Sequence, residues 1–113
     1  MSVAVRRLLF EAYRRNRMAD DVENRKPLEQ RWLGLGSKSA YRPVLEAGLM
    51  RFHDGENPPP RCMGWLVLTP EGVAAMKGLE DEFAEAMDRL EADPAYQRSI
   101  RANYLLAGGI LSR

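Results

Sequence analysis

Cysteine and histidine are nearly absent from this chain of 113 residues, which contains one of each, Cys62 and His53. One cysteine excludes an internal disulfide, and one cysteine with one histidine is too few for the usual zinc site. His53 is interpreted as an ordinary strand residue, and no neighbouring pattern marks Cys62 as a reactive thiol. We therefore expect no metal and no cofactor.

Long apolar runs are also missing, since no stretch approaches the roughly 20 residues needed to cross a bilayer. Arginines interrupt the apolar residues of the amino-terminal segment, whereas a signal peptide places its charges before an unbroken apolar run. Catalytic motifs are absent too: there is no supported nucleophile and base, no phosphate-binding glycine loop and no convincing carboxylate pair. These absences favour a cytoplasmic protein that is not an enzyme and does not bind a membrane.

Charge is nearly balanced overall but is unevenly distributed along the chain. Residues 1–61 contain 12 Lys and Arg against 8 Asp and Glu, a net charge of +4. Residues 62–113 contain 5 against 8, a net charge of −3. A basic first half favours an anionic partner, because neutralising phosphates supplies most non-specific affinity for DNA.

Helical spacing of apolar residues predicts an amphipathic helix over residues 3–18. A second, short helix is expected over residues 27–33, with a proline at its first position and Trp32 in the core. Gly34 and Gly36 then provide the tight turn before a third helix, because glycine adopts positive φ at little cost.

The third helix is expected to begin near Ser37 or Ser39, either of which could cap it, and to end at Gly48. Capping at Ser39 gives a helix over residues 40–47, with Pro43 at the margin of its first turn. This leaves only two helical turns to contact a partner.

Two extended segments, residues 50–53 and 62–69, flank a loop with three consecutive prolines and predict a β-hairpin. Trp65 on the second strand is assigned to the core. Thr69 followed by Pro70 is a typical helix start, with a hydroxyl cap and a proline in the first turn.

The helix that begins there is predicted to run over residues 70–92, followed by a last helix after residue 93. Its apolar residues step by three and four positions, a pattern compatible with a helix partner. The proposed dimerisation residues are Met76, Leu79, Phe83 and Leu90. Packing within the chain itself explains the same pattern equally well.

Three short motifs mark the turn, the exit into the hairpin and the return from it: residues 33–35, residues 45–50 and residues 68–72. With this order of elements, the chain resembles the winged helix-turn-helix regulators of bacteria that dimerise through terminal helices. The resemblance implies a recognition helix in a major groove of double-stranded DNA and a wing near the backbone. It assigns DNA contacts to six residues: Ser37, Lys38, Ser39, Tyr41, Arg42 and Arg61.

We therefore predict a mostly α protein with a small β-hairpin, a winged helix-turn-helix with long C-terminal helices. Residues 1–92 form the winged-helix domain and residues 93–113 a helical extension. The predicted function is that of a dimeric transcriptional regulator. The alternative is a winged-helix module that binds another protein, because Pro43 and the short third helix leave little surface for reading bases.

Overall fold

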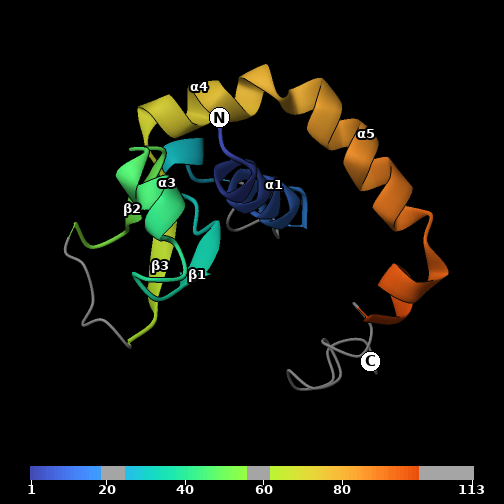
Figure 1. Cartoon of the computed structure of the whole chain (residues 1–113), viewed down its shortest axis with the longest axis horizontal. Helices are drawn as coiled ribbons and strands as arrows, with labels where there is room; N and C mark the ends of the chain where they lie inside the picture. Colours follow the sequence, from blue (N-terminus) through green and yellow to red (C-terminus); the bar gives the residue numbers. More distant parts are fainter. Residues whose placement is uncertain (19–24, 56–61, 100–113) are drawn as a thin grey trace. The chain divides into compact units, whose positions relative to one another are not determined.

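The computed structural model describes residues 1–18, 25–55 and 62–99 and is drawn in Figure 1. The described part is mostly helical and contains one small antiparallel sheet, which confirms the predicted class of structure. The elements in chain order are α1 (Val3–Met18), η1 (Leu28–Gln30), β1 (Gly34–Gly36), α3 (Arg42–Glu46), β2 (Met50–Phe52), β3 (Gly64–Leu68), α4 (Pro70–Gly78) and α5 (Glu80–Glu91).

The sheet has the strand order β1-β3-β2, so β3 lies in the middle and pairs antiparallel with both neighbours. Leu66 of β3 is opposite Gly34 on one side and Phe52 on the other, and Leu68 is opposite Met50. Because directly opposed residues point to the same face, these five residues form one face of the sheet. All five are buried, so this is the core face.

Two helices from distant parts of the sequence complete the core. Helix α1 contacts α3, α4 and β1, and α3 also contacts β2. The side chains of Leu9 and Ala12 on α1 and of Val44 on α3 are buried, as the helical spacing of apolar residues requires. The helix predicted over residues 3–18 is thereby confirmed.

The glycines that were expected to form a turn between two helices lie instead in strand β1, and neither has a positive φ. Their role is to admit the ring of Tyr41. A Cβ on Gly36 would lie 2.5 Å from Tyr41 Cε2, and one on Gly34 would lie 3.1 Å from Tyr41 Cε1. The prediction of a turn was wrong because the missing side chains serve close packing rather than backbone freedom.

The helices on either side of these glycines are also shorter than predicted. The segment expected to be helical over residues 27–33 contains only the single 3₁₀ turn η1. Helix α3 begins at Arg42 rather than at residue 40, after a turn in which the Ser37 hydroxyl accepts a hydrogen bond from Ala40 N at 3.2 Å. Pro43 therefore lies within the first turn of α3, where its missing N–H breaks no helical hydrogen bond.

The end of α3 and the start of α4 agree with the sequence. Gly48 has φ +72°, as a glycine after a helix should. Thr69 caps α4 by accepting a hydrogen bond from Gly72 N at 3.0 Å. The same hydroxyl donates to Gly48 O at 2.6 Å, and Thr69 N donates to Leu49 O at 3.1 Å. Thr69 therefore joins the turn before β2 to the helix after β3.

The single long helix predicted over residues 70–92 is wrong, because the structure divides it into α4 and α5. Leu79, the C-cap of α4, has ψ +7° and donates its backbone N–H to Met76 O. Gly78 comes directly before this residue and has the lowest helix propensity apart from proline. A helix-breaking glycine thus prevails over the apolar pattern that continues past it.

The chain divides into two compact units, residues 1–80 and residues 81–113. In the second unit a further helical segment covers residues 94–99. The Asp93 carboxylate accepts a hydrogen bond from Ala95 N at 2.9 Å, so the predicted restart of a helix after this residue is confirmed. The domain boundary proposed after residue 92 stays a prediction.

Candidate functional site

The residues assigned to DNA contact lie in the turn before α3 and at its first position. Lys38, Ser39 and Arg42 are exposed, and Ser37 is half-buried. The hydroxyls of Ser37 and Ser39 lie 3.4 Å apart, which makes this a compact polar turn. The structure therefore brings two cations and two hydroxyls together within six residues, at the edge where α3 begins.

Tyr41 differs from the rest of this group, because its side chain is only 6% exposed and lies on Gly34 and Gly36. Burial raises the pKa of the Tyr41 hydroxyl above its ordinary value of 10.0, and the Arg15 charge opposes that rise. With so little accessible surface, Tyr41 is a core residue. Its assignment to direct DNA contact does not fit this position.

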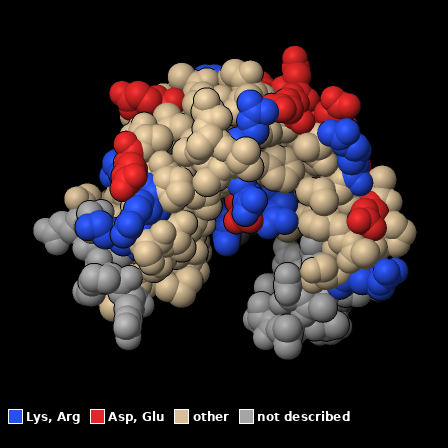
Figure 2. Space-filling view, in the orientation of Figure 1, with Lys and Arg blue, Asp and Glu red and all other residues tan. Residues whose placement is uncertain are grey.

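Helix α1, which packs against α3, is also basic. Helix α1 packs against α3, and Arg15 is close enough to Tyr41 to affect its ionisation. The helix contains five arginines and one acidic residue, Glu11, which gives it a net charge of +4. The arginines are Arg6, Arg7, Arg14, Arg15 and Arg17. In Figure 2, basic side chains lie over the region of α3 and β2, with an acidic side chain beside them.

The hairpin of β2 and β3 forms as predicted, and Gly55 after β2 has φ +76°. Arg61, the residue assigned to the wing, lies outside the described residues. Cys62 is exposed just before β3. Met63 follows it and is 64% exposed.

Both tryptophans were assigned to the core, and both assignments were wrong, because each residue is 37% exposed. Trp65 is opposite Leu35, and Val67 is opposite Arg51, so these four residues belong to the other face of the sheet, on which Val67 is buried and Trp65 and Arg51 are exposed. We call this the outer face. Alternation along β3 places the leucines inside and Trp65 outside.

An aromatic cluster lies on the outer face. The rings of Trp32 and Trp65 stack with centroids 5.1 Å apart and an interplanar angle of 18°. His53 meets Trp32 edge-on at 5.4 Å, and Lys26 Nζ lies 4.6 Å from the centre of a Trp32 ring. Such stacked and cation–π contacts hold the indoles in place while leaving part of each accessible.

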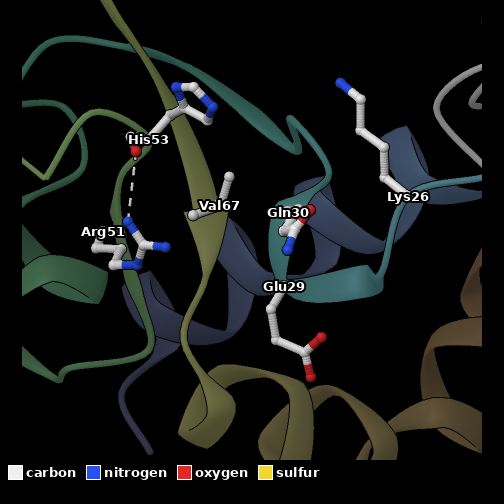
Figure 3. Close-up of a pocket in the computed structure, with 6 residues that line it drawn as sticks. All are labelled: Lys26, Glu29, Gln30, Arg51, His53 and Val67. Carbon is white, nitrogen blue, oxygen red and sulfur yellow. Dashed lines mark hydrogen bonds between the residues drawn. The ribbon is translucent and has the colours of Figure 1, made fainter.

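A pocket with a volume of about 210 Å³ opens on the same face. Val67 forms its floor between the strands, and the 3₁₀ turn η1 forms one wall. Figure 3 shows the Glu29 carboxylate directed away from His53 and from the Lys26 amino group. The residues that line the pocket are Lys26, Glu29, Gln30, Arg51, His53 and Val67.

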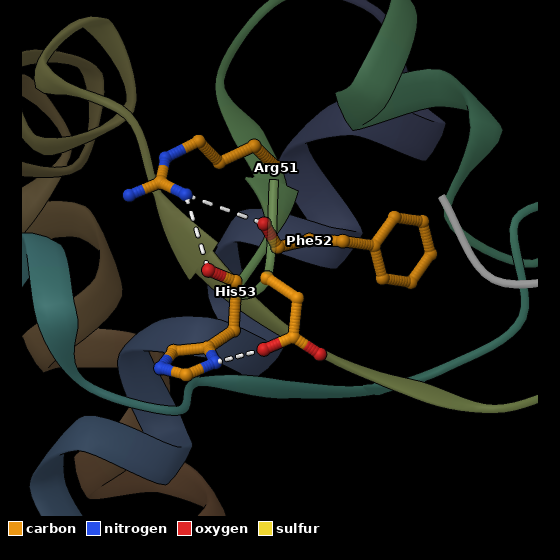
Figure 4. A network of polar contacts seen from close by, with 4 residues as sticks. Arg51, Phe52 and His53 are labelled. Carbon is orange, nitrogen blue, oxygen red and sulfur yellow. Dashed lines mark hydrogen bonds and ion pairs between the residues drawn. The ribbon is translucent and has the colours of Figure 1, made fainter. Parts of the chain in front are cut away.

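Arg51 is held at the edge of this pocket by its own strand. Its Nη1 donates to Phe52 O at 3.3 Å and to His53 O at 3.4 Å, and Figure 4 shows the other terminal nitrogen directed away from both carbonyls. His53 Nδ1 lies 2.9 Å from an Asp54 carboxylate oxygen. The guanidinium is therefore oriented by the backbone and keeps a second terminal nitrogen turned outward.

The four residues proposed for dimerisation differ in burial. Met76 and Phe83 are buried within the chain itself, whereas Leu79 and Leu90 are half-buried. The helix break at Leu79 also interrupts the repeat that links them. The apolar spacing in α4 and α5 is thus used in part by the chain's own packing.

Within residues 1–18, 25–55 and 62–99, no group of three or more His, Cys, Asp or Glu side chains is placed to hold a metal ion. None of the helices in this described part has both the length and the apolar character to span a bilayer.

The residues around Trp65 indicate that this side chain does not belong to the core face. Trp32 and Trp65 carry the largest side chains in the chain, and each is followed directly by a leucine. A period of two in the segment around Trp65 assigns Leu66 and Leu68 to one face and Trp65 to the other. Stacking of the two indoles depends on a tertiary contact that no sequence spacing encodes.

No protein-family model matches this chain, and the comparisons with curated proteins and with solved structures give no match either.

Proposed function

We propose that this protein is a small DNA-binding protein that acts as a dimeric transcriptional regulator. The observation that carries the proposal is the basic edge formed by α1 and α3. There the exposed Arg42 is the first residue of α3, which packs against a helix with five arginines and one glutamate, and the exposed Lys38 lies in the turn before α3. Such an edge fits the phosphate backbone of a duplex, because each neutralised phosphate releases counterions and favours binding.

Helix α3 determines how this edge would bind. It has five residues, which at 1.5 Å per residue span about 7.5 Å, much less than a typical recognition helix. Contacts with phosphates therefore dominate over contacts with base edges. The hairpin of β2 and β3 acts as the wing in this proposal and lies near the backbone beside α3.

A dimer places two such edges on neighbouring half-sites of the duplex. Half-sites one turn apart are separated by roughly 34 Å, so two weak phosphate-binding edges act together. The half-buried Leu79 and Leu90 are the dimerisation residues that retain accessible surface. Association through them makes DNA binding depend on protein concentration.

The experiment is a duplex-binding titration at about 50 mM and 200 mM salt, with the double variant Lys38→Ala/Arg42→Ala. We expect the double variant to bind more weakly and to reduce the slope of log K against log salt by about 1.8, since each lost phosphate contact contributes about 0.9. Lys77→Ala is the matched control, because Lys77 is an exposed cation in the last turn of α4. Equal binding by the double variant and the control contradicts the proposal.

The second candidate function is binding to another protein, and the shortness of α3 favours it. A five-residue helix offers few side chains to a groove but can still form part of a protein interface. Recovery of the protein from its own cells before and after nuclease treatment separates the two functions. A stable protein partner that persists after nuclease, together with unchanged duplex binding by Lys38→Ala/Arg42→Ala, replaces the first proposal with the second.

A further inference from the structure

We propose that the outer face of the sheet binds single-stranded nucleic acid at the Trp32–Trp65 cluster, a site separate from the basic edge of α1 and α3. The stacked indoles supply the surface for an unpaired base, and the cations around them contact its phosphates. This proposal goes beyond duplex binding, because it concerns different residues and a different form of the ligand.

The aromatic pair is built in a way that leaves a stacking surface on Trp65. One face of the Trp32 indole is taken by Trp65, and Lys26 Nζ lies over a Trp32 ring. The base therefore stacks on the accessible part of Trp65, which is 37% exposed on the outer face. Stacking on an indole requires no particular base, because every base has a planar π surface.

The charges around the indoles favour an anion. Two cations and one acid line the pocket beside the indoles, which gives these side chains a net charge of +1. The cations are Lys26 and Arg51, and the acid is Glu29. Asp54 adds one carboxylate nearby, and an oxygen of it lies 2.9 Å from His53 Nδ1.

Geometry increases this bias at the pocket. The Glu29 carboxylate points away from the other charged groups (Figure 3), whereas the outward terminal nitrogen of Arg51 stays available for a phosphate oxygen (Figure 4). Arg51 and Trp65 project from adjacent strands on the same face, Arg51 opposite Val67 and Trp65 two residues earlier on β3. A base on Trp65 and a phosphate near Arg51 therefore belong to one nucleotide or to neighbouring ones.

Several observations together favour single-stranded nucleic acid over an isolated anion as the ligand. An anion alone would need the cations but would have no use for two exposed indoles on a sheet. Proteins bind the unpaired bases of single-stranded nucleic acid with exposed aromatic side chains on a sheet that are bordered by cations.

Intrinsic tryptophan fluorescence tests this site directly, because both tryptophans of the chain belong to the cluster. We expect an oligothymidylate of about 12 nucleotides to quench the fluorescence at low salt. Polyphosphate of matched charge, a duplex of the same length and thymidine monophosphate should each bind more weakly and quench less. Absence of quenching by the oligonucleotide overturns the proposal, and so does equal quenching by any of these three ligands.

Variants then assign the contacts, with affinity measured from the anisotropy of a labelled oligonucleotide. Trp65→Ala should weaken binding roughly 5- to 150-fold, the range found for loss of one stacked base. Trp65→Phe should recover most of it, since a phenyl ring also stacks. Arg51→Gln should reduce the salt slope by about 0.7, the value for one phosphate contact on a single strand. Equal affinities for the wild type and Trp65→Ala contradict the proposal.

Further controls separate this site from the basic edge and from a protein interface. Lys38→Ala/Arg42→Ala should keep full affinity for the oligonucleotide, even though it is designed to lose duplex binding. If Trp65→Ala is unstable, the Trp65→Phe and Arg51→Gln measurements still decide the outcome. Loss of a protein partner in Trp65→Ala, with oligonucleotide binding unchanged, assigns the cluster to that partner and overturns the proposal.

Discussion

The two faces of strand β3 are built from neighbouring residues and differ in almost every property. Leu66 and Leu68 on the core face have no accessible surface, whereas Trp65 between Gly64 and Leu66 is 37% exposed. On the core face, Leu66 is opposite a glycine of β1, and the glycines of β1 let the Tyr41 ring approach the backbone. The outer face meets another tryptophan and charged side chains. One face therefore stabilises the fold, and the other offers a surface to a ligand.

The difference between the two faces shows that residue size and hydrophobicity are poor guides to burial on a strand. Tryptophan is the largest apolar side chain, yet alternation along the strand decides which face it occupies. Since Leu66 and Leu68 already fill the core, Trp65 must point outward. Its stacking partner Trp32 then removes part of the remaining apolar surface from water.

The difference between the two faces is tested most strongly by removing one side chain from each of them. Leu66→Ala should reduce the free energy of unfolding by about 3–5 kcal/mol, because it leaves a cavity at a fully buried position. Trp65→Ala should reduce it by about 1–2 kcal/mol, since a partly exposed ring loses less buried area and one stacking contact. Urea unfolding of both variants gives these values. Equal losses contradict the assignment of the two faces.

A smaller effect tests how closely the core face is packed. Gly36→Ala should cost about 1–3 kcal/mol, because its Cβ would lie 2.5 Å from the Tyr41 ring. Gly78→Ala is the matched control: a Cβ there meets nothing within 4 Å, and alanine favours the end of α4 by about 0.5–1 kcal/mol. In thermal unfolding, the midpoint temperature should be lower than that of the wild type for Gly36→Ala and not for Gly78→Ala. Two unchanged midpoints would show that Tyr41 does not lie on Gly36.

The smallest effect concerns the ionisation of Tyr41 on the core face. Burial raises the pKa of its hydroxyl in the folded chain above the ordinary value of 10.0. The unfolded chain therefore loses this proton at lower pH than the folded chain does. Stability from this residue is fully present below about pH 10 and is lost as the pH rises through the folded pKa.

Tyr41→Phe isolates that contribution, because it keeps the ring and removes the ionisable group. Between about pH 8 and pH 11 the wild type should lose stability relative to Tyr41→Phe, with the difference appearing above pH 10. Urea midpoints at each pH measure it. A difference that stays constant over the whole range contradicts the raised pKa.

Local features of the fold could be predicted from the sequence, whereas long-range ones could not. Gly48 after α3 and Thr69 before α4 were identified correctly, because their roles depend on backbone angles and on residues within three positions. Strand β1 was missed, because a strand of three residues has too short a pattern and depends on pairing with β3, about 30 residues later. The break at Leu79 could have been anticipated from Gly78.

The candidate site was only partly predictable for the same reason. Lys38 and Arg42, which were assigned to DNA contact, are exposed, since they lie in a polar turn and at a helix start. Tyr41 was placed among them by the resemblance to winged helix-turn-helix regulators, but its ring turns inward to the glycines of β1. Trp32 and Trp65 were assigned to the core, and the cluster that they form was not predicted.

The sequence by itself determined the mostly helical class with a β-hairpin, the basic character of the first half and the caps that begin and end its elements. These features follow from composition and from interactions between near neighbours in the chain. Only the tertiary structure decided that Gly34 and Gly36 accommodate Tyr41 and that Trp32 stacks on Trp65 outside the core. Both arrangements depend on strand register and on contacts between distant residues, which the local pattern does not specify.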